Sequence, residues 1–277
     1  MLMRIFVASL VFIFANSSAS NWSYEESTGP EHWGEIGYPI CSGGYRQSPI
    51  DIPNAVIAPA QSMLPFELTC DWNSGRPLSI TNNGHTVQGT LNGQYNSKGG
   101  PLLSTVFLAE QFHFHWGMTN DVGSEHTVRG QAYPAEMHIV HYDSTRFNNV
   151  SEAMNSNMGL AVFGFFIGIS QDDNTAMQSI VQGISGLGMG QTKDVQTPFN
   201  LSSLLPMPLG NYWNYNGSLT TPPCYESVIW TVFETPITIS QTQMDMFRQL
   251  GDSTSHPIIN NFRPIMNTNQ RPIIYNV

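Results

Sequence analysis

The stretch of residues 111–116, with the sequence QFHFHW, constrains the fold more than any other part of the chain. If it forms a β-strand, its side chains alternate between two faces. One face then carries His113 and His115, and the opposite face carries three aromatic side chains that must be buried. Two imidazoles whose backbones lie roughly 6.6 Å apart on one face can converge on one metal ion. A His-x-His pair alone does not distinguish such a site from two histidines with ordinary structural roles.

The rest of the chain is dominated by short strand patterns separated by turn signals. Strands are expected at residues 78–80, 86–91, 105–116, 135–142, 160–169 and 228–233. Residues 160–167 are apolar on both faces, which predicts a central strand covered on each side. Two helices are expected, one capped by Asp173 or Asn174 and one whose Ser240 and Gln243 form a capping box. The pattern predicts a β-dominated α+β fold, a single domain around a large, twisted, mostly antiparallel sheet with a few short surface helices.

The N-terminus has the composition of a secretory signal peptide over residues 1–19, with a basic start, an apolar stretch and a small-residue cleavage site. The mature chain, residues 20–277, is expected to form the single domain, with residues 20–55 as an irregular tail on its surface. No other run is long and apolar enough to span a membrane, so we expect a secreted, soluble protein. The net charge is −10, and basic residues are scarce and scattered, which excludes a nucleic-acid footprint.

Three cysteines and several glycosylation sequences fit an extracellular protein. In an oxidising compartment two of the cysteines can pair and one is left over, and composition does not say which. The cysteines are Cys41, Cys70 and Cys224. The Asn-x-Ser sequences of the mature chain begin at Asn21, Asn149, Asn200 and Asn216.

A second strand pattern, residues 135–141, supplies a third histidine. Its period of two puts Glu136 and His138 on one face. If this strand neighbours residues 111–116, three imidazoles surround one ion, and three histidines with an open fourth position are typical of a catalytic zinc site. Glu136 and Gln111 each lie two residues before a candidate ligand, where they can accept its other N–H group. This repeated arrangement favours metal binding over a core histidine.

Several separate motifs resemble those of the α-class carbonic anhydrases, zinc lyases of which secreted members are known. They are residues 29–33, 46–52, 82–85, 111–117, 123–127, 135–141 and 218–223. The resemblance extends from about Trp22 to Arg263, which covers nearly all of the mature chain. It implies that residues 20–277 form a catalytic domain, that Zn²⁺ is the cofactor, and that carbon dioxide and bicarbonate are the substrates. The implied zinc ligands are His113, His115 and His138.

The same resemblance implies roles for residues around the ion. In carbonic anhydrases zinc lowers the pKa of its bound water to about 7, so hydroxide is available to attack carbon dioxide. Thr220 and Glu125 match the pair that orients this hydroxide, although Glu125 alone could be a solvated loop residue. By the resemblance, His85 matches the position of the proton shuttle, although it could be a surface histidine without a role. The unperturbed pKa of a histidine, about 6.5, suits proton transfer in either direction.

The remaining implied residues fall into three groups. Residues expected to bind the substrate are Val140, Val162, Leu219, Thr220, Thr221 and Trp230. Residues expected to support the histidines or order water are Gln111, Glu136, the backbone carbonyl of Asn261, Tyr24 and Asn83. Secreted members of the family pair cysteines at the positions of Cys41 and Cys224, which leaves Cys70 either buried and inert or exposed and able to join a second chain. The protein is therefore expected to be a monomer or a dimer.

Two other functions remain open at this stage. A secreted carbonic-anhydrase-like binding or matrix protein would keep the scaffold without turnover, although such relatives tend to lose the zinc ligands. A cupin-type iron or manganese oxygenase also uses a His-x-His pair, but it requires a nearby glutamate ligand in a double-stranded barrel. The motifs around Thr220 and Ser48 have no reason to exist in a cupin.

Overall fold

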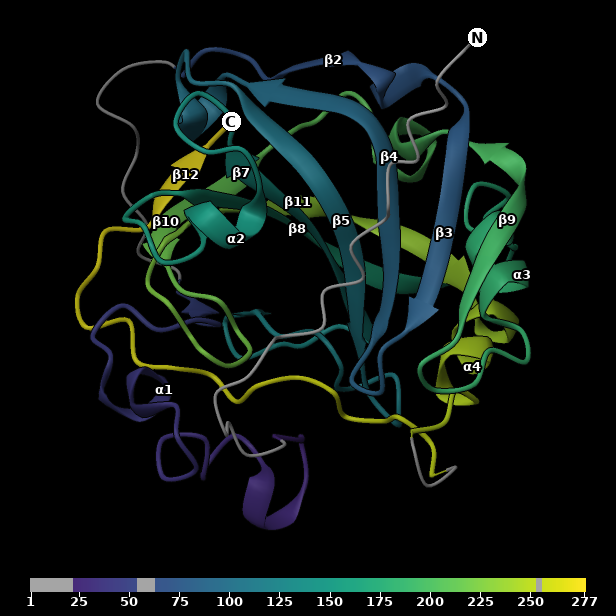
Figure 1. Ribbon diagram of the computed structural model, residues 1–277, viewed down its shortest axis with the longest axis horizontal. Coiled ribbons are helices and arrows are strands. Elements are labelled where there is room, and N and C mark those ends of the chain that lie inside the picture. The colour runs from purple at the N-terminus through teal and green to yellow at the C-terminus, as the bar shows by residue number, and fades with distance from the viewer. Residues whose placement is uncertain (1–21, 54–62, 253–255) are drawn as a thin grey trace, which may run out of the picture.

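A ten-stranded twisted sheet forms the centre of the molecule (Figure 1). The computed structural model describes residues 22–53, 63–252 and 256–277, so the expected signal peptide and Asn21 lie outside the described residues. The strands of this sheet are β2 (Glu67–Cys70), β3 (Arg76–Asn82), β4 (Val87–Lys98), β5 (Phe107–Trp116), β7 (Ala135–Asp143), β8 (Leu160–Ser170), β9 (Thr192–Phe199), β10 (Tyr212–Gly217), β11 (Val228–Ser240) and β12 (Ile274–Asn276).

The strand order is β12-β10-β11-β8-β7-β5-β4-β3-β9, and β2 pairs with β4 beside this path. Every pair in the large sheet is antiparallel except β11 with β8. β1 (Asp51–Ile52) and β6 (Thr127–Val128) form a separate parallel pair. The structure therefore confirms the predicted β-dominated, mostly antiparallel single domain. It also confirms the central strand, because β8 lies between β11 and β7 and is buried from Leu160 to Ile167.

The helices are short and lie outside the sheet (Figure 1). The α-helices are α1 (Pro39–Gly43), α2 (Val150–Ala153), α3 (Gln178–Ile184) and α4 (Gln241–Arg248), and the 3₁₀ helices are η1 (Glu26–Thr28), η2 (Asp71–Asn73), η3 (Gly100–Leu102) and η4 (Leu201–Leu204). The capping box that begins α4 is confirmed, with Ser240 and Gln243 bonded reciprocally. None of the helices in the described part of the chain combines the length and apolar character needed to cross a membrane.

The start of the other predicted helix was wrong. α3 begins at Gln178 rather than directly after Asp173 or Asn174. The Asn174 side chain instead accepts hydrogen bonds from the backbone of Ala176 and Met177, at 3.0 and 3.3 Å, and so caps a turn that precedes the helix. Asparagine side chains favour such turns as readily as helix starts, which is why the sequence pattern did not separate the two.

Two buried hydrophobic clusters lie on opposite faces of the sheet. One contains the aromatic face of β5, with Phe112, Phe114 and Trp116 fully buried, and it extends to α3 and α4. Burying each such ring stabilises the fold by roughly 1.5–3 kcal/mol relative to exposure. The second cluster, on the other face, contains Val140 and Trp230. The histidine-bearing face of β5 is thus supported from behind by a packed aromatic layer.

The N-terminal segment is anchored more firmly than a surface tail. Trp33 is fully buried, and it packs in one cluster with Cys41 and Cys224. These two cysteines form a disulfide with a Cα–Cα distance of 5.1 Å, which confirms the predicted pairing. Cys70 is an exposed free thiol at the end of β2.

Candidate metal centre

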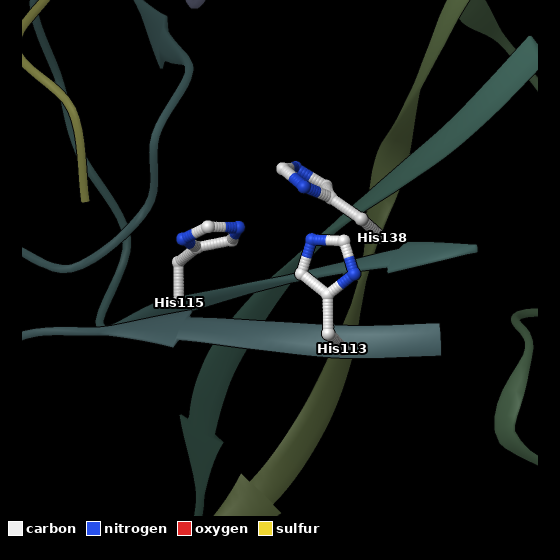
Figure 2. A group of neighbouring side chains, drawn as sticks. All are labelled: His113, His115 and His138. Atoms are coloured by element: carbon white, nitrogen blue, oxygen red, sulfur yellow. The ribbon is translucent and has the colours of Figure 1, made fainter. Parts of the chain in front are cut away.

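Three histidines from two neighbouring strands converge on one point (Figure 2). His113 and His115 come from β5, and His138 of β7 lies directly opposite His113 in the antiparallel ladder. The ring centroids are 5.1 Å apart for His113 and His115, 5.2 Å for His113 and His138, and 4.7 Å for His115 and His138. One nitrogen from each ring lies within 4.8 Å of the corresponding nitrogens of the other two.

The second nitrogen of each ring has an oxygen partner of its own. His113 Nδ1 lies 2.9 Å from Gln111 Oε1, and His115 Nδ1 lies 2.7 Å from the carbonyl oxygen of Asn261. His138 Nε2 lies 2.7 Å from Glu136 Oε1. Each of these oxygens accepts a hydrogen bond, so the ring proton is placed on the partnered nitrogen. The lone pairs are then left on His113 Nε2, His115 Nε2 and His138 Nδ1.

The surroundings of His113 and His115 favour the neutral form of each ring. Burial, together with the other two histidines, lowers the pKa of His113 well below its usual value. Burial also lowers the pKa of His115, whose Nε2 atom is buried without a hydrogen-bond partner in the described residues. Neutral imidazoles with unshared lone pairs are what a divalent metal requires. Three nitrogen donors with no cysteine fit zinc in a site that leaves a coordination position open.

Glu125 reaches the same point from a loop, but its arrangement differs from the expected one. Its Oε1 atom accepts a hydrogen bond of 2.9 Å from the backbone N–H of Arg263. Its Oε2 atom is buried, lies 3.4 Å from His115 Nε2, and has no hydrogen-bond partner among the described residues. The expected hydrogen bond from Thr220 is not formed in the described structure, although Thr220 is also buried. One carboxylate oxygen therefore remains able to accept a hydroxyl proton.

The turn after β3 holds His85 next to Asn261, whose side chain donates to the His85 carbonyl at 2.9 Å and whose own carbonyl supports His115. The Asn83 side-chain oxygen accepts hydrogen bonds from the backbone of His85 and Thr86, at 3.0 and 2.9 Å, so Asn83 shapes this turn. The half-buried His85 ring stacks on Trp22 at a centroid distance of 3.8 Å and an angle of 10°. Burial lowers its pKa from the ordinary value of 6.5. Tyr24 lies next to Trp22 at 5.5 Å between ring centroids.

An apolar wall adjoins the histidines. Val140, Val162 and Trp230 are register partners across the three neighbouring strands β7, β8 and β11, and each is at most 5% exposed. The Trp230 ring lies 4.8 Å from the His138 ring, and its indole N–H donates to the carbonyl of Ser218. Leu219 packs against the same cluster. Thr221, the last of the expected substrate-binding residues, is partly buried in the loop that follows.

Comparison with known proteins gives a consistent result. Residues 28–277 match the family model described as eukaryotic-type carbonic anhydrase. The chain belongs to the eukaryotic-type carbonic anhydrase family. Curated relatives include carbonic anhydrase 7 of Homo sapiens, which is 42% identical over 251 residues covering 88% of this chain and 92% of the relative. Carbonic anhydrase 3 of Sus scrofa is 38% identical over 89% of this chain and 94% of the relative. Carbonic anhydrase 1 of Monodelphis domestica is 40% identical over 83% of this chain and 86% of the relative.

This carbonic anhydrase site depends on a hydrogen-bonded chain that sequence reasoning missed. Buried His126 places Nδ1 at 2.7 Å from Glu136 Oε1 and Nε2 at 2.7 Å from the hydroxyl of Tyr215. The Tyr215 hydroxyl donates to Ser48 Oγ at 2.8 Å. Burial alone would raise the pKa of Glu136, but the imidazoles of His126 and His138 lower it, so the carboxylate stays charged. The only signal for His126 was its position beside Glu125 in the motif of residues 123–127.

His126, Glu136 and His138 also form a second group with metal-ligating atoms. Their facing atoms are already joined by hydrogen bonds of 2.7 Å, which place protons between them. This group therefore orients the carbonic anhydrase histidines and leaves the set of His113, His115 and His138 as the candidate metal centre.

Arg263 is the second missed residue. Its buried guanidinium donates to Gln47 Oε1 at 2.9 Å and to the carbonyls of Ser48 and Cys41 at 2.8 and 2.6 Å. Its backbone N–H donates to the Glu125 carboxylate. Arg263 therefore contacts both the disulfide-bonded N-terminal segment and the carboxylate of the site. Arginine is common on protein surfaces, and nothing local to its sequence position predicted its burial.

Proposed function

We propose that this chain is an active zinc-dependent carbonic anhydrase that reversibly hydrates carbon dioxide to bicarbonate and a proton. The observation that carries the proposal is the complete set of His113, His115 and His138, each oriented through its second nitrogen and each turned toward the same point. When bound there, zinc would lower the pKa of water to about 7, a value established for carbonic anhydrases in general.

The residues around the three histidines are proposed to bind carbon dioxide and to orient the attacking oxygen. Val140, Val162 and Trp230 offer an apolar surface beside the site, suited to a nonpolar gas and unsuited to competing water. Glu125 Oε2 is the acceptor that Thr220 would need in order to turn its own acceptor side toward the attacking oxygen. In the proposed reaction this pair selects one orientation of the nucleophile.

His85 is the proposed carrier of the released proton. It is half-buried, its backbone carbonyl accepts a hydrogen bond from the Asn261 side chain, and burial lowers its pKa from the ordinary value of 6.5. A neutral imidazole there accepts a proton from water, and the protonated ring then gives it to buffer. Stacking on Trp22 stabilises one orientation of the His85 ring. Tyr24 and Asn83 are the proposed polar residues along the connecting water path.

The proposal includes secretion. It is supported by the signal-like composition of residues 1–19 and by the Cys41–Cys224 disulfide, because such bonds persist in oxidising compartments. Asn216, one of the proposed glycosylation positions, is exposed. Cys70 is exposed as well, so a disulfide-linked dimer is available, and non-reducing gels of wild type and Cys70→Ser would distinguish it from a monomer.

A stopped-flow assay of carbon dioxide hydration tests the proposal. Purified enzyme is assayed as isolated, after removal of metal by a chelator, and after addition of one equivalent of zinc. We expect hydration that is lost on chelation and restored by zinc. Zinc bound without measurable hydration would instead support the non-catalytic binding or matrix protein. Activity that follows iron or manganese rather than zinc would contradict the proposed cofactor.

A further inference from the structure

Asn261 connects the turn that bears His85 to the strand that bears His115, and it does so through two different groups. The residue is only 1% exposed. Its backbone carbonyl accepts the hydrogen bond from His115 Nδ1 at 2.7 Å. Its side-chain amide nitrogen donates to the backbone carbonyl of His85 at 2.9 Å. The resemblance to carbonic anhydrases implied a role for the Asn261 carbonyl alone, so the contacts of the side chain are a separate feature of this residue.

The carboxamide of Asn261 takes the place of a neighbouring strand along the end of β5. The described ladder between β4 and β5 ends at His113. Beyond that residue, the Asn261 side-chain oxygen accepts a hydrogen bond of 2.7 Å from the backbone N–H of Trp116, and its nitrogen donates to the carbonyl of Phe114 at 3.3 Å. Because these two residues flank His115 in the chain, the position of the Asn261 side chain is fixed relative to this metal ligand.

The backbone of His85 is held mainly from within its own turn. Its N–H donates to the Asn83 side chain at 3.0 Å. Among the described residues, Asn261 is the one hydrogen-bond partner of His85 outside that turn, and the His85 ring stacks on Trp22 without a hydrogen bond. The next residue, Thr86, is hydrogen-bonded separately to the backbone of β5. Loss of the Asn261 amide should therefore loosen His85 without unfolding the turn.

The distance between His85 and the metal centre matters because the released proton must cross it through water. A displacement of about 1 Å from a productive geometry can lower a rate by about 10²-fold. A single buried residue that is bonded to both His85 and His115 fixes this distance. We propose, on the basis of the proposed carbonic anhydrase activity, that the Asn261 side chain is a positioning residue for proton transfer, which holds His85 at a fixed distance from the metal centre.

Asn261→Ala tests this proposal in the zinc-loaded full chain. The variant keeps the backbone carbonyl that supports His115 and removes the amide that holds His85. Because the proton leaves after carbon dioxide has reacted, we expect kcat for hydration to fall about three- to tenfold while kcat/KM stays within about twofold of wild type. Added imidazole buffer should restore kcat, since it supplies a carrier that needs no anchor. Zinc binding, measured by competition with a dye, should remain stoichiometric.

A double variant separates the positioning of His85 from a general structural role. If Asn261 acts through His85, Asn261→Ala should lower kcat no further in a His85→Ala background, because the two effects are then not additive. Ser227→Ala is the matched control, since it removes another buried side chain that donates to a backbone carbonyl, that of Met154 at 2.7 Å. It should lower the unfolding temperature but leave both kinetic constants unchanged.

Backbone order parameters measured by NMR test the anchor without any enzyme activity. In wild type, residues 83–86 should have the values of a rigid backbone, about 0.85, and in Asn261→Ala these values should fall toward about 0.6. Asn261→Ser, which leaves room for a water molecule, is the second variant if Asn261→Ala does not fold, and the same kinetic and NMR results are expected of it.

Three results would overturn the inference: unchanged order parameters in the variant, a parallel fall in kcat and kcat/KM, or a further loss of kcat in the double variant. A wild type that binds zinc but hydrates no carbon dioxide would instead contradict the proposed function. In that case the order parameters would still decide whether the Asn261 side chain holds His85 in place.

Discussion

Two histidines on strand β7, three residues apart, are equally buried but sit in opposite environments. His138 faces the polar side of the sheet, where Glu136 accepts a hydrogen bond from its Nε2 and where His113 and His115 face its Nδ1. His141 faces the apolar side, where its ring lies 4.5 Å from Phe163. Its Nδ1 lies 3.0 Å from the Ile139 carbonyl, and its Nε2 has no partner in the described residues.

The comparison shows that burial by itself does not make a histidine a ligand. Both rings are at most 1% exposed. On one side of His138 lies the carboxylate of Glu136, which accepts its hydrogen bond. On the other side lie two further imidazole nitrogens that can ligate a metal, so His138 is oriented to share a cation with them. His141 has aromatic neighbours in front of it, so burial lowers its pKa to about 4 and it remains neutral. Substitutions at these and neighbouring positions test this contrast.

The same substitution at both positions gives the largest expected difference. His138→Phe keeps a ring but removes the nitrogen donor, and we expect zinc affinity to fall by more than about 10²-fold, since loss of a supporting partner alone costs 10–100-fold. His141→Phe should retain stoichiometric zinc and hydration activity. Competition with a zinc-binding dye and stopped-flow assays measure the two effects. Equal zinc affinity in the two variants would break the comparison.

His141 should affect stability in acid, whereas His138 affects zinc binding. Its pKa is about 6.5 in the unfolded chain and about 4 in the folded one, so the unfolded state binds more protons between these values. The free energy of unfolding should therefore fall by about 3 kcal/mol as the pH decreases from 6.5 to 4, and this contribution is fully present above pH 6.5. Urea denaturation measures the slope.

His141→Phe is the control for this slope. With no titrating ring in the aromatic core, the metal-free variant should lose less stability than metal-free wild type over the same pH interval. Identical slopes in the two proteins would show that another buried group accounts for the acid sensitivity.

His85 is a third case, a histidine at the edge of the site rather than on either face of β7. His85→Ala should lower kcat for hydration by about 10²-fold, because water transfers protons less effectively than a placed imidazole. Added imidazole buffer should restore part of the rate. In wild type, kcat should rise with pH through an inflection below 6.5, because burial lowers the pKa of His85 and only the neutral ring accepts a proton. No loss of rate in the variant would assign the transfer to another group.

Glu136→Gln should also lower zinc affinity, but by less than His138→Phe. The variant keeps an oxygen for the His138 N–H but removes the negative charge that His126 and His138 share. We expect zinc affinity about 10–100-fold below that of wild type. Affinity within a factor of about two of wild type would show that the charge behind His138 is dispensable.

Much of this arrangement could be predicted from local sequence. Alternation along residues 111–116 and 135–141 placed the histidines, Gln111 and Glu136 on common faces, and the ladder between β5 and β7 follows that pattern. The apolar run of β8 indicated its central place. The resemblance to carbonic anhydrases added what alternation could not, including the Cys41–Cys224 disulfide and the Asn261 carbonyl.

What escaped prediction depends on contacts between distant segments. His126, Tyr215 and Ser48 form one hydrogen-bonded chain although they come from separate parts of the sequence. Arg263 is buried only because the carbonyls of the N-terminal segment surround it. The sequence likewise contained no signal that the buried amide of Asn276 has no hydrogen-bond partner among the described residues, because satisfaction of a buried polar group is a property of the whole fold.

X-ray absorption at the zinc edge tests the central claim most directly, because it counts the ligands of the ion in the folded enzyme. For wild type reconstituted with one equivalent of zinc, the account predicts three imidazole nitrogens at about 2.0–2.1 Å and no sulfur. His141→Phe should give the same spectrum, and His138→Phe should not. A sulfur ligand at about 2.3 Å, or an unchanged spectrum in His138→Phe, would contradict a site built from His113, His115 and His138.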